Sequence, residues 1–376
     1  MNPKPNIRNL LEKESFSHDE LVTLLSVDKA EQELIFEKAS QVKQNTVGNK
    51  VYLRGLVEYS NICTKNCLYC GVRSGNKNIR RYRLTENEVL EAAQFILDHH
   101  FGSMVIQGGE LSSTQNTRRI GQLVTKIKQL SQGKIGITLS MGEQSRETYR
   151  YWFECGAHRY LLRIETSNPD LYKKIHPMDT FHSFEKRLQA LDDLRNEGFQ
   201  VGTGVMIGLP FQTNDDLAND LEFFKNFDID MIGMGPYIEH KNTPLYQYKD
   251  LLLPPLDRFY LSLKMLALLR ITMPDINIAA TTAMETIHPR GKILALQAGA
   301  NVIMPNITPL KYRDDYLLYE GKPHINEESQ LILDHLIQDI SAIHCEIGWD
   351  NWGDSRHFFY RLYENKEIDP NPKYYL

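Results

Sequence analysis

Cys63, Cys67 and Cys70 are the residues whose spacing most directly suggests chemistry. They lie in the run CTKNCLYC, directly after an apolar, strand-like segment, and no nearby cysteine or histidine completes the set. A structural zinc site normally has four protein ligands, and a ferredoxin-type cluster is held by four thiolates. Three thiolates can instead hold three irons of a four-iron cluster and leave the fourth iron free. We therefore expect an open iron beside a strand end, which indicates catalysis rather than a structural role.

Composition limits the classes of protein that need to be considered. The chain has 376 residues, of which 41% are hydrophobic and 24% are charged, as in an ordinary soluble globular protein. Its formal net charge of −5 favours neither nucleic acid nor an anionic membrane as a partner. The N-terminus does not resemble a secretory signal, and no apolar stretch is long enough to span a membrane. The two other cysteines, Cys155 and Cys345, are isolated, so we expect a reducing compartment, the cytoplasm.

The hydrophobic pattern predicts an α/β protein. Short strand-like runs alternate with longer amphipathic stretches, and this alternation predicts parallel pairing through crossover connections. Closure of eight such units gives a complete (β/α)₈ TIM-type barrel. The expected strands are 51–60, 103–109, 134–142, 159–165, 199–208, 230–237, 276–284 and 300–306.

The flanking segments are expected to be helical. Residues 1–50 read as an N-terminal helical extension with Asp19 and Asp28 as capping residues, followed by the barrel at 51–325. A C-terminal helix and tail, 326–376, would pack on the barrel. The proline-bearing segment 238–259 is predicted to be a surface excursion or a lid.

Polar residues gather where active groups of such a barrel lie, at the carboxyl ends of the strands. The cysteines follow the first expected strand, and glycines, polar residues and one methionine lie late in several later strands or just after them. These residues are Gly108, Gly109 and Glu110; Ser140 and Glu143; Arg163 and Glu165; Thr281 and Thr282; and Met304 and Asn306.

The C-x₃-C-x₂-C spacing resembles the cluster motif of the radical S-adenosylmethionine (SAM) enzymes, and QGGE (107–110) resembles their GGE motif. The resemblance implies one [4Fe-4S] cluster on Cys63, Cys67 and Cys70, whose open iron binds SAM. Simpler readings remain: Tyr69 as a packed aromatic, Arg163–Glu165 as a structural pair, and Arg187 as a solvated helix arginine. The SAM-side residues implied by the resemblance are Tyr69, Gly109, Glu110, Ser140, Glu165 and Arg187.

Longer segments resemble the HydE family, the radical SAM maturases that help to build the active-site cluster of [FeFe]-hydrogenase. The resemblance spans about residues 45–325, and the discriminating segments are LALLRITMPDINIAATTAM and ANVIMPNITPLKYRDDYLLYEGK. It implies that a 5′-deoxyadenosyl radical acts on a small cysteine-bound iron complex with carbonyl and cyanide ligands. A HydG-type maturase would supply this complex, a HydF-type scaffold would receive the diiron precursor, and a further partner would donate electrons. The implied substrate cavity contains Thr138, Arg163, Met231, Thr281, Thr282, Met304 and Tyr319.

The sequence departs from the family pattern in two ways. Some members carry a second cluster on three cysteines near the C-terminal part of the barrel, but only Cys345 lies in that region here, so we expect none. Gly108 stands where the family often has serine, which leaves the substrate less certain. A methylornithine-synthase-like or biotin-synthase-like radical SAM enzyme is one alternative, and a non-catalytic metal-binding scaffold is another.

Overall fold

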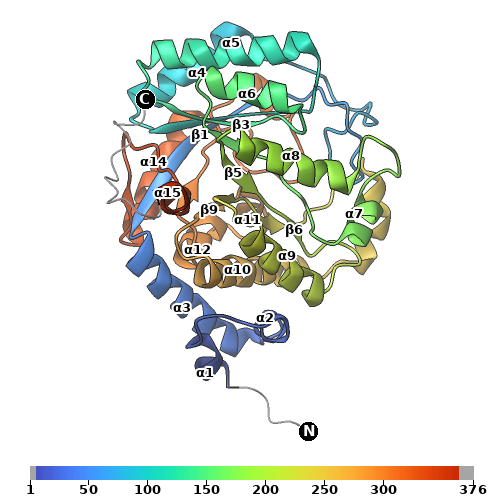
Figure 1. The fold of residues 1–376 in the computed structure, drawn as a ribbon, viewed down its shortest axis with the longest axis vertical. Helices are drawn as coiled ribbons and strands as arrows, with labels where there is room; N and C mark the ends of the chain where they lie inside the picture. The colour runs from blue at the N-terminus through green and yellow to red at the C-terminus, as the bar shows by residue number, and fades with distance from the viewer. Residues whose placement is uncertain (1–5, 364–376) are drawn as a thin grey trace.

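The computed structural model of the chain, described for residues 6–363, is built around a closed barrel of parallel strands (Figure 1). Each strand pairs with the next, and β10 pairs with β1 to close the ring, with Tyr52 opposite Val302. The predicted complete barrel is therefore confirmed. Its strands are β1 Lys50–Ser60, β2 Ser103–Gly108, β3 Gly136–Ser140, β4 Arg159–Leu161, β5 Gln200–Thr203, β7 Met231–Ile232, β9 Asn277–Ala280 and β10 Val302–Ile303.

Two of the predicted strands are broken near their carboxyl ends. The expected strand 199–208 divides into β5 and β6 (Met206–Ile207), and β7 is followed by β8 (Gly235–Pro236). A Cβ on Gly204 would lie 2.0 Å from the carbonyl oxygen of Gly233, so the two backbone segments approach too closely there for a side chain. Beyond this point β6 and β8 pair as a separate two-stranded sheet at the mouth of the barrel.

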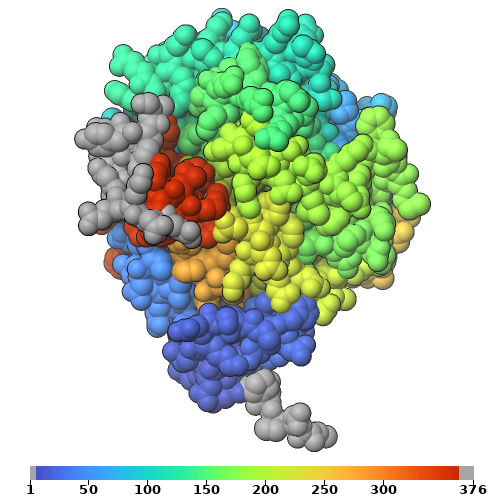
Figure 2. Space-filling view, in the orientation of Figure 1, coloured from blue at the N-terminus to red at the C-terminus, as the bar shows by residue number. Residues whose placement is uncertain are grey.

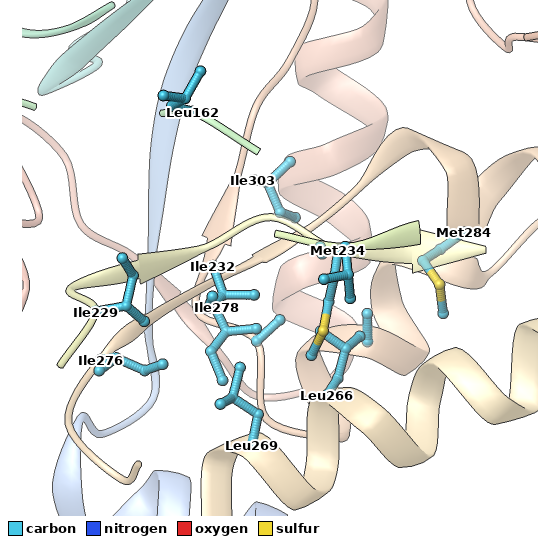
Figure 3. Packing of buried hydrophobic residues seen from close by; sticks show 14 of the residues in the cluster. Leu162, Ile229, Ile232, Met234, Leu266, Leu269, Ile276, Ile278, Met284 and Ile303 are labelled. Carbon is cyan, nitrogen blue, oxygen red and sulfur yellow. The ribbon is translucent and has the colours of Figure 1, made fainter. Parts of the chain in front are cut away.

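Helices cover the outside of the barrel, and their apolar faces complete its core. In Figure 3, Ile232 of β7 and Ile278 of β9 face Leu266 and Leu269 on one of these helices, α10. No helix in the described part of the chain has both the length and the apolar composition needed to cross a membrane. The covering helices are α4 Glu86–Asp98, α5 Thr114–Leu130, α6 Arg146–Glu154, α7 Pro169–Ile175, α8 Phe184–Asn196, α9 Asn214–Asn226, α10 Pro255–Thr272, α11 Thr282–Ile287, α12 Gly291–Gln297 and α13 Leu310–Arg313.

The N-terminal segment is helical, as predicted, and projects below the barrel (Figure 2). Asp28 caps its longest helix, but the prediction for Asp19 is wrong. Ser17 is the cap there, and Glu20 completes a capping box with it, so Asp19 lies inside the first turn. Lys264 of α10 donates to the carbonyl of Val27 and so ties this segment to the barrel. The three helices are α1 Ile7–Leu11, α2 His18–Leu25 and α3 Lys29–Thr46.

The predicted excursion 238–259 is shorter than expected, because α10 already begins at Pro255. It contains a 3₁₀ helix, η1 (Pro244–Leu251), whose Leu245 is buried. The Leu245 amide donates to the carbonyl of Leu68, inside the cysteine run, at 3.0 Å. The excursion therefore packs against the cysteine loop.

A segment that follows all the barrel strands closes the amino-terminal end of the barrel. The Trp352 carbonyl accepts hydrogen bonds from Ser103 and Arg159, and the Gly353 carbonyl accepts one from Arg54. The Asp354 carboxylate lies 2.7 Å from Arg159 Nη1. The elements around this plug, residues 348–355, are α14 Ser329–Ala342, β11 Glu346–Ile347, which pairs with β1, and α15 Arg356–Tyr363. Residues 1–5 and 364–376 of the predicted extensions lie outside the described residues.

Replacing Asp354 with alanine should destabilise the protein strongly. Arg159 is fully buried, so the variant would leave its charge without a carboxylate partner. Loss of one partner of a buried pair costs about 3–5 kcal/mol, and urea denaturation should show this loss. Asp350→Ala is the matched control, since Asp350 is 70% exposed and pairs only with exposed His100. Equal denaturation midpoints for the two variants would contradict a stabilising role for the Arg159–Asp354 pair.

Candidate active site

The cysteine run leaves the carboxyl end of β1 and brings its three thiols close together. Burial raises the pKa of all three, that of Cys67 to about 12, and the neighbouring thiols raise the pKa of Cys70 further. The Glu110 amide donates to Cys63 Sγ at 3.3 Å. Thiolates are the form that binds metal, so a bound cationic group must replace these protons.

The arrangement of the thiols fits a cluster better than a single ion. Among residues 6–363, no group of three or more His, Cys, Asp or Glu side chains converges tightly enough to hold one metal ion. Cysteines that each bind a different iron need not converge on one point, whereas zinc ligands must. The donor set is therefore compatible with the [4Fe-4S] cluster that the sequence predicts.

Arg81 holds the loop in shape by binding its backbone. Its guanidinium donates to the carbonyls of Asn61, Val72, Arg73 and Asn76. The sequence analysis gave this arginine no role, because nothing in its spacing shows that four carbonyls converge on it. Burial lowers the pKa of Arg81, and the nearby Cys63 and Cys70 offset part of this shift, so Arg81 also lies near the cysteines.

The end of β2 approaches the cysteine loop so closely that only glycine fits. A Cβ on Gly109 would lie 2.3 Å from the carbonyl oxygen of Ile62. A Cβ on Gly108 would lie 3.1 Å from the sulfur of Met141, so the serine common in the family would require Met141 to shift slightly. Glu110 follows directly, and its carboxylate accepts a hydrogen bond of 2.8 Å from the Glu143 amide.

Four charged side chains, two of them buried and two partly buried, join the cysteine loop to two strand ends and a helix. Lys65 Nζ lies 2.9 Å from Glu143 and 3.4 Å from Glu110. Glu143 also pairs with Arg187 of α8, which donates to the Arg163 carbonyl. Burial and the Glu143 charge raise the pKa of Glu110, whereas Arg187 and Lys65 outweigh burial and lower the pKa of Glu143. We call Lys65, Glu110, Glu143 and Arg187 the four-charge network.

Glu165 adopts a backbone conformation that is unusual for a residue with a side chain. Its φ is 67°, in the left-handed region, and such strain of about 1–3 kcal/mol is retained mostly at functional sites. Its amide donates to the Gly204 carbonyl, its carbonyl accepts from the Met206 amide, and its carboxylate pairs with Arg163 at 2.9 Å. The Arg163–Glu165 pair is therefore formed, and it faces a cavity.

A cavity of about 310 Å³ lies in the carboxyl-terminal half of the barrel, beside the cysteines. We call it the upper cavity. A smaller space of about 30 Å³ lies deeper in the barrel, and Met304 lines both. The predicted residues that line the upper cavity are Cys67, Cys70, Tyr69, Arg163, Glu165, Thr281, Thr282, Met304 and Tyr319.

Other predicted residues lie outside the wall of the upper cavity. Thr138 and Met231 line the deeper space, where Thr138 accepts a hydrogen bond from Arg159 and Met231 accepts one from Arg54. Gly109, Glu110 and Arg187 lie behind the cysteine loop, and Ser140 ends β3 opposite Gln107 of β2. Of the residues predicted to contact SAM, the structure places Tyr69, Gly109, Glu110, Glu165 and Arg187 near the cysteines. It separates the residues predicted to contact substrate into two levels.

The sequence analysis missed an ion pair in the wall of the upper cavity. Lys322 pairs with Glu58 of β1, and both side chains are buried. Asn306 donates to the other oxygen of Glu58 at 3.2 Å. A charged residue in the apolar strand 51–60 was the available signal for Glu58. No local signal marked Lys322.

Comparison with known proteins decides the family. Residues 57–224 match the Radical SAM superfamily. The chain is 43% identical over 350 residues to the [FeFe] hydrogenase maturase subunit HydE of Thermotoga maritima, covering 93% of this chain and 97% of that protein. The chain belongs to the HydE family. It is therefore a radical SAM enzyme with a role in [FeFe]-hydrogenase maturation, as the sequence predicts.

More distant relatives share the barrel. The chain is 26% identical to 3-methylornithine synthase of Methanosarcina acetivorans, covering 78% of this chain and 80% of that protein. The crystal structure of methylornithine synthase (PylB) superposes with a TM-score of 0.78 at 23% identity, covering 92% of this chain and 98% of that one. The maturase HydG gives 0.76 at 19%, covering 92% and 76%. At these identities the structures show the shared fold alone, and the much higher HydE identity favours that family over the methylornithine-synthase alternative.

Arg81→Ala should weaken metal binding by the HydE-family cysteine loop. Hydrogen bonds from a charged group contribute about 1.5–3 kcal/mol each, so losing four should loosen the loop and lower bound iron several-fold. Iron content and visible absorption after anaerobic reconstitution measure this. Arg80→Ala is the control, because Arg80 is 63% exposed and makes an ion pair with Asp315. Full iron loading of Arg81→Ala would show that the loop keeps its shape without the guanidinium.

Proposed function

We propose that this HydE-family enzyme acts on a small cysteine-bound iron complex with carbonyl and cyanide ligands and yields the precursor of the diiron subcluster. A HydG-type maturase would supply the complex, and a HydF-type scaffold would receive the product. The observation that carries this proposal is the upper cavity, an internal site of small size with charged and hydroxyl groups in its wall. Family membership gives the wider process.

The size of the upper cavity supports a small substrate. Small-molecule sites occupy about 300–1,000 Å³, and the upper cavity lies at the lower end of that range at about 310 Å³. A cavity of this size is too small for a folded protein segment. The plug at the opposite end of the barrel and the packed core limit access by water, which protects reactive species from side reactions.

The wall of the upper cavity supports a substrate that carries both charges. Arg163 and Lys322 can donate to carboxylate or cyanide groups, and Thr281 and Thr282 add hydroxyl donors. Glu58 and Glu165 can accept from an ammonium group. A cysteine bound to an iron–cyanide fragment has all of these groups. Without substrate, Arg163 pairs with Glu165 and Lys322 pairs with Glu58, so none of the four charges lacks a partner.

The three cysteines and the predicted residues around them are proposed to hold the cofactors. Cys63, Cys67 and Cys70 would bind the [4Fe-4S] cluster, and SAM bound to it supplies a 5′-deoxyadenosyl radical in this superfamily. Tyr69, Gly109, Glu110, Ser140, Glu165 and Arg187 are the proposed SAM contacts. Because Cys155 and Cys345 are isolated in sequence, we also expect one cluster and about four irons per chain, which iron analysis of the reconstituted protein tests.

Complementation is the direct test of the proposed function. The protein should restore active hydrogenase in a maturation system that lacks only the HydE activity, and Cys67→Ser should not. Conversion of lysine to methylornithine by the reduced enzyme with SAM would contradict the proposal and favour the methylornithine-synthase alternative. Absence of reductive SAM cleavage would favour the non-catalytic scaffold.

Thr282→Val should separate substrate use from SAM cleavage. The substitution keeps the shape of the side chain and removes one hydroxyl from the wall of the upper cavity. Loss of one hydrogen bond of about 1–1.5 kcal/mol lowers the rate of substrate conversion up to about tenfold, and dithionite-driven SAM cleavage should stay unchanged. Thr125→Val on α5 is the control, since its hydroxyl only bonds the Gly121 carbonyl of its own helix. Unchanged maturation by Thr282→Val would remove this hydroxyl from the substrate contacts.

A further inference from the structure

A loop beside the cysteines exposes two large apolar side chains. Met178 is 90% exposed and Phe181 is 70% exposed, the highest values among the large hydrophobic residues of the described chain. Both lie between α7 and α8. Single exposed apolar residues are common on proteins, but two at one loop tip, three positions apart, form a patch that water solvates poorly.

This loop contacts the cysteine run directly. The Asn66 amide donates to His182 Nε2 at 2.9 Å, and Lys65 donates to the Phe181 carbonyl. Asn66 and Lys65 lie between Cys63 and Cys67 in sequence. The loop and the cysteine segment are also neighbours at the right edge of Figures 1 and 2, where green meets blue. The loop that carries the apolar patch is therefore hydrogen-bonded to the segment that carries the three cysteines.

The cysteine segment gives this patch a basic border. Residues 61–83 contain six Lys or Arg side chains and no Asp or Glu, although the whole chain has a net charge of −5. Within the described chain, the hydrogen bonds of Arg73 go to the side-chain oxygen of Asn66 and the Asn242 carbonyl, and Lys77 donates to the Ser74 carbonyl. Lys77 is exposed and Arg73 is half-buried, and in the described chain neither has a carboxylate partner. Asp179, which lies between the two apolar residues, is paired with His182. Lys77, with Arg73 behind it, therefore gives the patch a positive side.

We infer that Arg73, Lys77, Met178 and Phe181 form the docking surface of an acidic one-electron carrier protein. This inference rests on the proposed function, because reductive SAM cleavage needs one electron per turnover from outside the chain. Electron transfer weakens steeply with distance, and this surface adjoins the cysteines: Thr64, next to Cys63, is itself exposed. We call these residues the donor surface.

The composition of the donor surface fits such a carrier better than a second copy of the chain. Protein interfaces combine an apolar centre with a polar rim, as Met178 and Phe181 do with Arg73 and Lys77. Charge complementarity accelerates association with an acidic partner. A symmetric contact between two copies would bring the same basic rims together, and the resulting repulsion opposes it.

The test compares a protein reductant with a small one. The double variant Lys77→Glu/Phe181→Ser should raise the KM for reduced flavodoxin, an acidic one-electron carrier, by about tenfold in SAM cleavage assays. The rate with dithionite should stay within about twofold, because dithionite needs no docking surface. Raising the salt concentration should raise the flavodoxin KM of the wild type more than that of the variant.

The control is Lys134→Glu/Leu331→Ser, which makes the same changes of charge and apolarity elsewhere. Lys134 is exposed at the opposite end of the barrel, and Leu331 is 45% exposed on α14. An unchanged flavodoxin KM in the donor-surface variant, an equal rise in the control, or a parallel fall of the dithionite rate would each overturn the inference. Loss of a wild-type dimer in the variant would assign the surface to a second copy instead. Failure of the proposed function would give a different result: the wild-type protein would not restore hydrogenase maturation, although reduced flavodoxin would still drive SAM cleavage.

Discussion

The four-charge network is the constraint on which the candidate site depends. Lys65 and Arg187 are buried and the two carboxylates are partly buried, and a buried charge is tolerated only when an opposite charge and hydrogen bonds compensate it. Lys65 belongs to the cysteine loop, Glu110 and Glu143 follow β2 and β3, and Arg187 belongs to α8. Four segments must therefore meet in one arrangement. The positions of the cysteines and of the Glu165 turn follow from it, since Arg187 also binds the Arg163 carbonyl.

The network also links the two halves of the site. On one side it supports the cysteine loop, through Lys65 and through the Glu110 amide on Cys63. On the other it reaches the Arg163–Glu165 pair in the wall of the upper cavity. A bound group that changes the charge near Glu110 would thus act on the same side chains that order the cavity wall. This linkage explains why the strained φ of Glu165 can persist in a stable barrel.

Much of the fold was readable from the sequence, because apolar runs and cap signals act over short distances. The eight strand-like runs and the cysteine spacing are local patterns. So are the capping boxes that begin α4 at Thr85 and α9 at Thr213, each completed by an acidic residue three positions later. The breaks in the strands at Gly204 and Gly233 could not be predicted, because the close approach of these two segments depends on both of them together. The prediction that Asp19 caps its helix was wrong for a different reason, because Ser17 caps the helix two residues earlier.

The candidate site likewise contains residues that short motifs predict and residues that only distant contacts bring into place. Cys63, Cys67, Cys70 and Glu110 belong to short motifs, and the barrel rule placed Arg163 and Thr282 near them. Lys322 is far from its partner Glu58 in sequence, and Arg81 binds carbonyls, which have no sequence signature. Thr138 lies in the middle of β3 and Met231 at the start of β7, so both lie below the upper cavity, where Arg159 and Arg54 bind their side chains. Such pairings arise only in the folded chain.

The plug at residues 348–355 has a consequence for biosynthesis. It follows every barrel strand in sequence, yet its carbonyls and carboxylate are the partners of Arg54 and Arg159 inside the barrel. Until the ribosome has made these residues, Arg54 and Arg159 lack the plug as a partner and can bond only to barrel residues such as Met231, Thr138 and Ser103, and the barrel floor stays open. The nascent barrel can form its strands in order, but its amino-terminal end is closed only after residues 348–355 have been made. Chaperone or metal-delivery factors that act earlier would meet a barrel open at both ends.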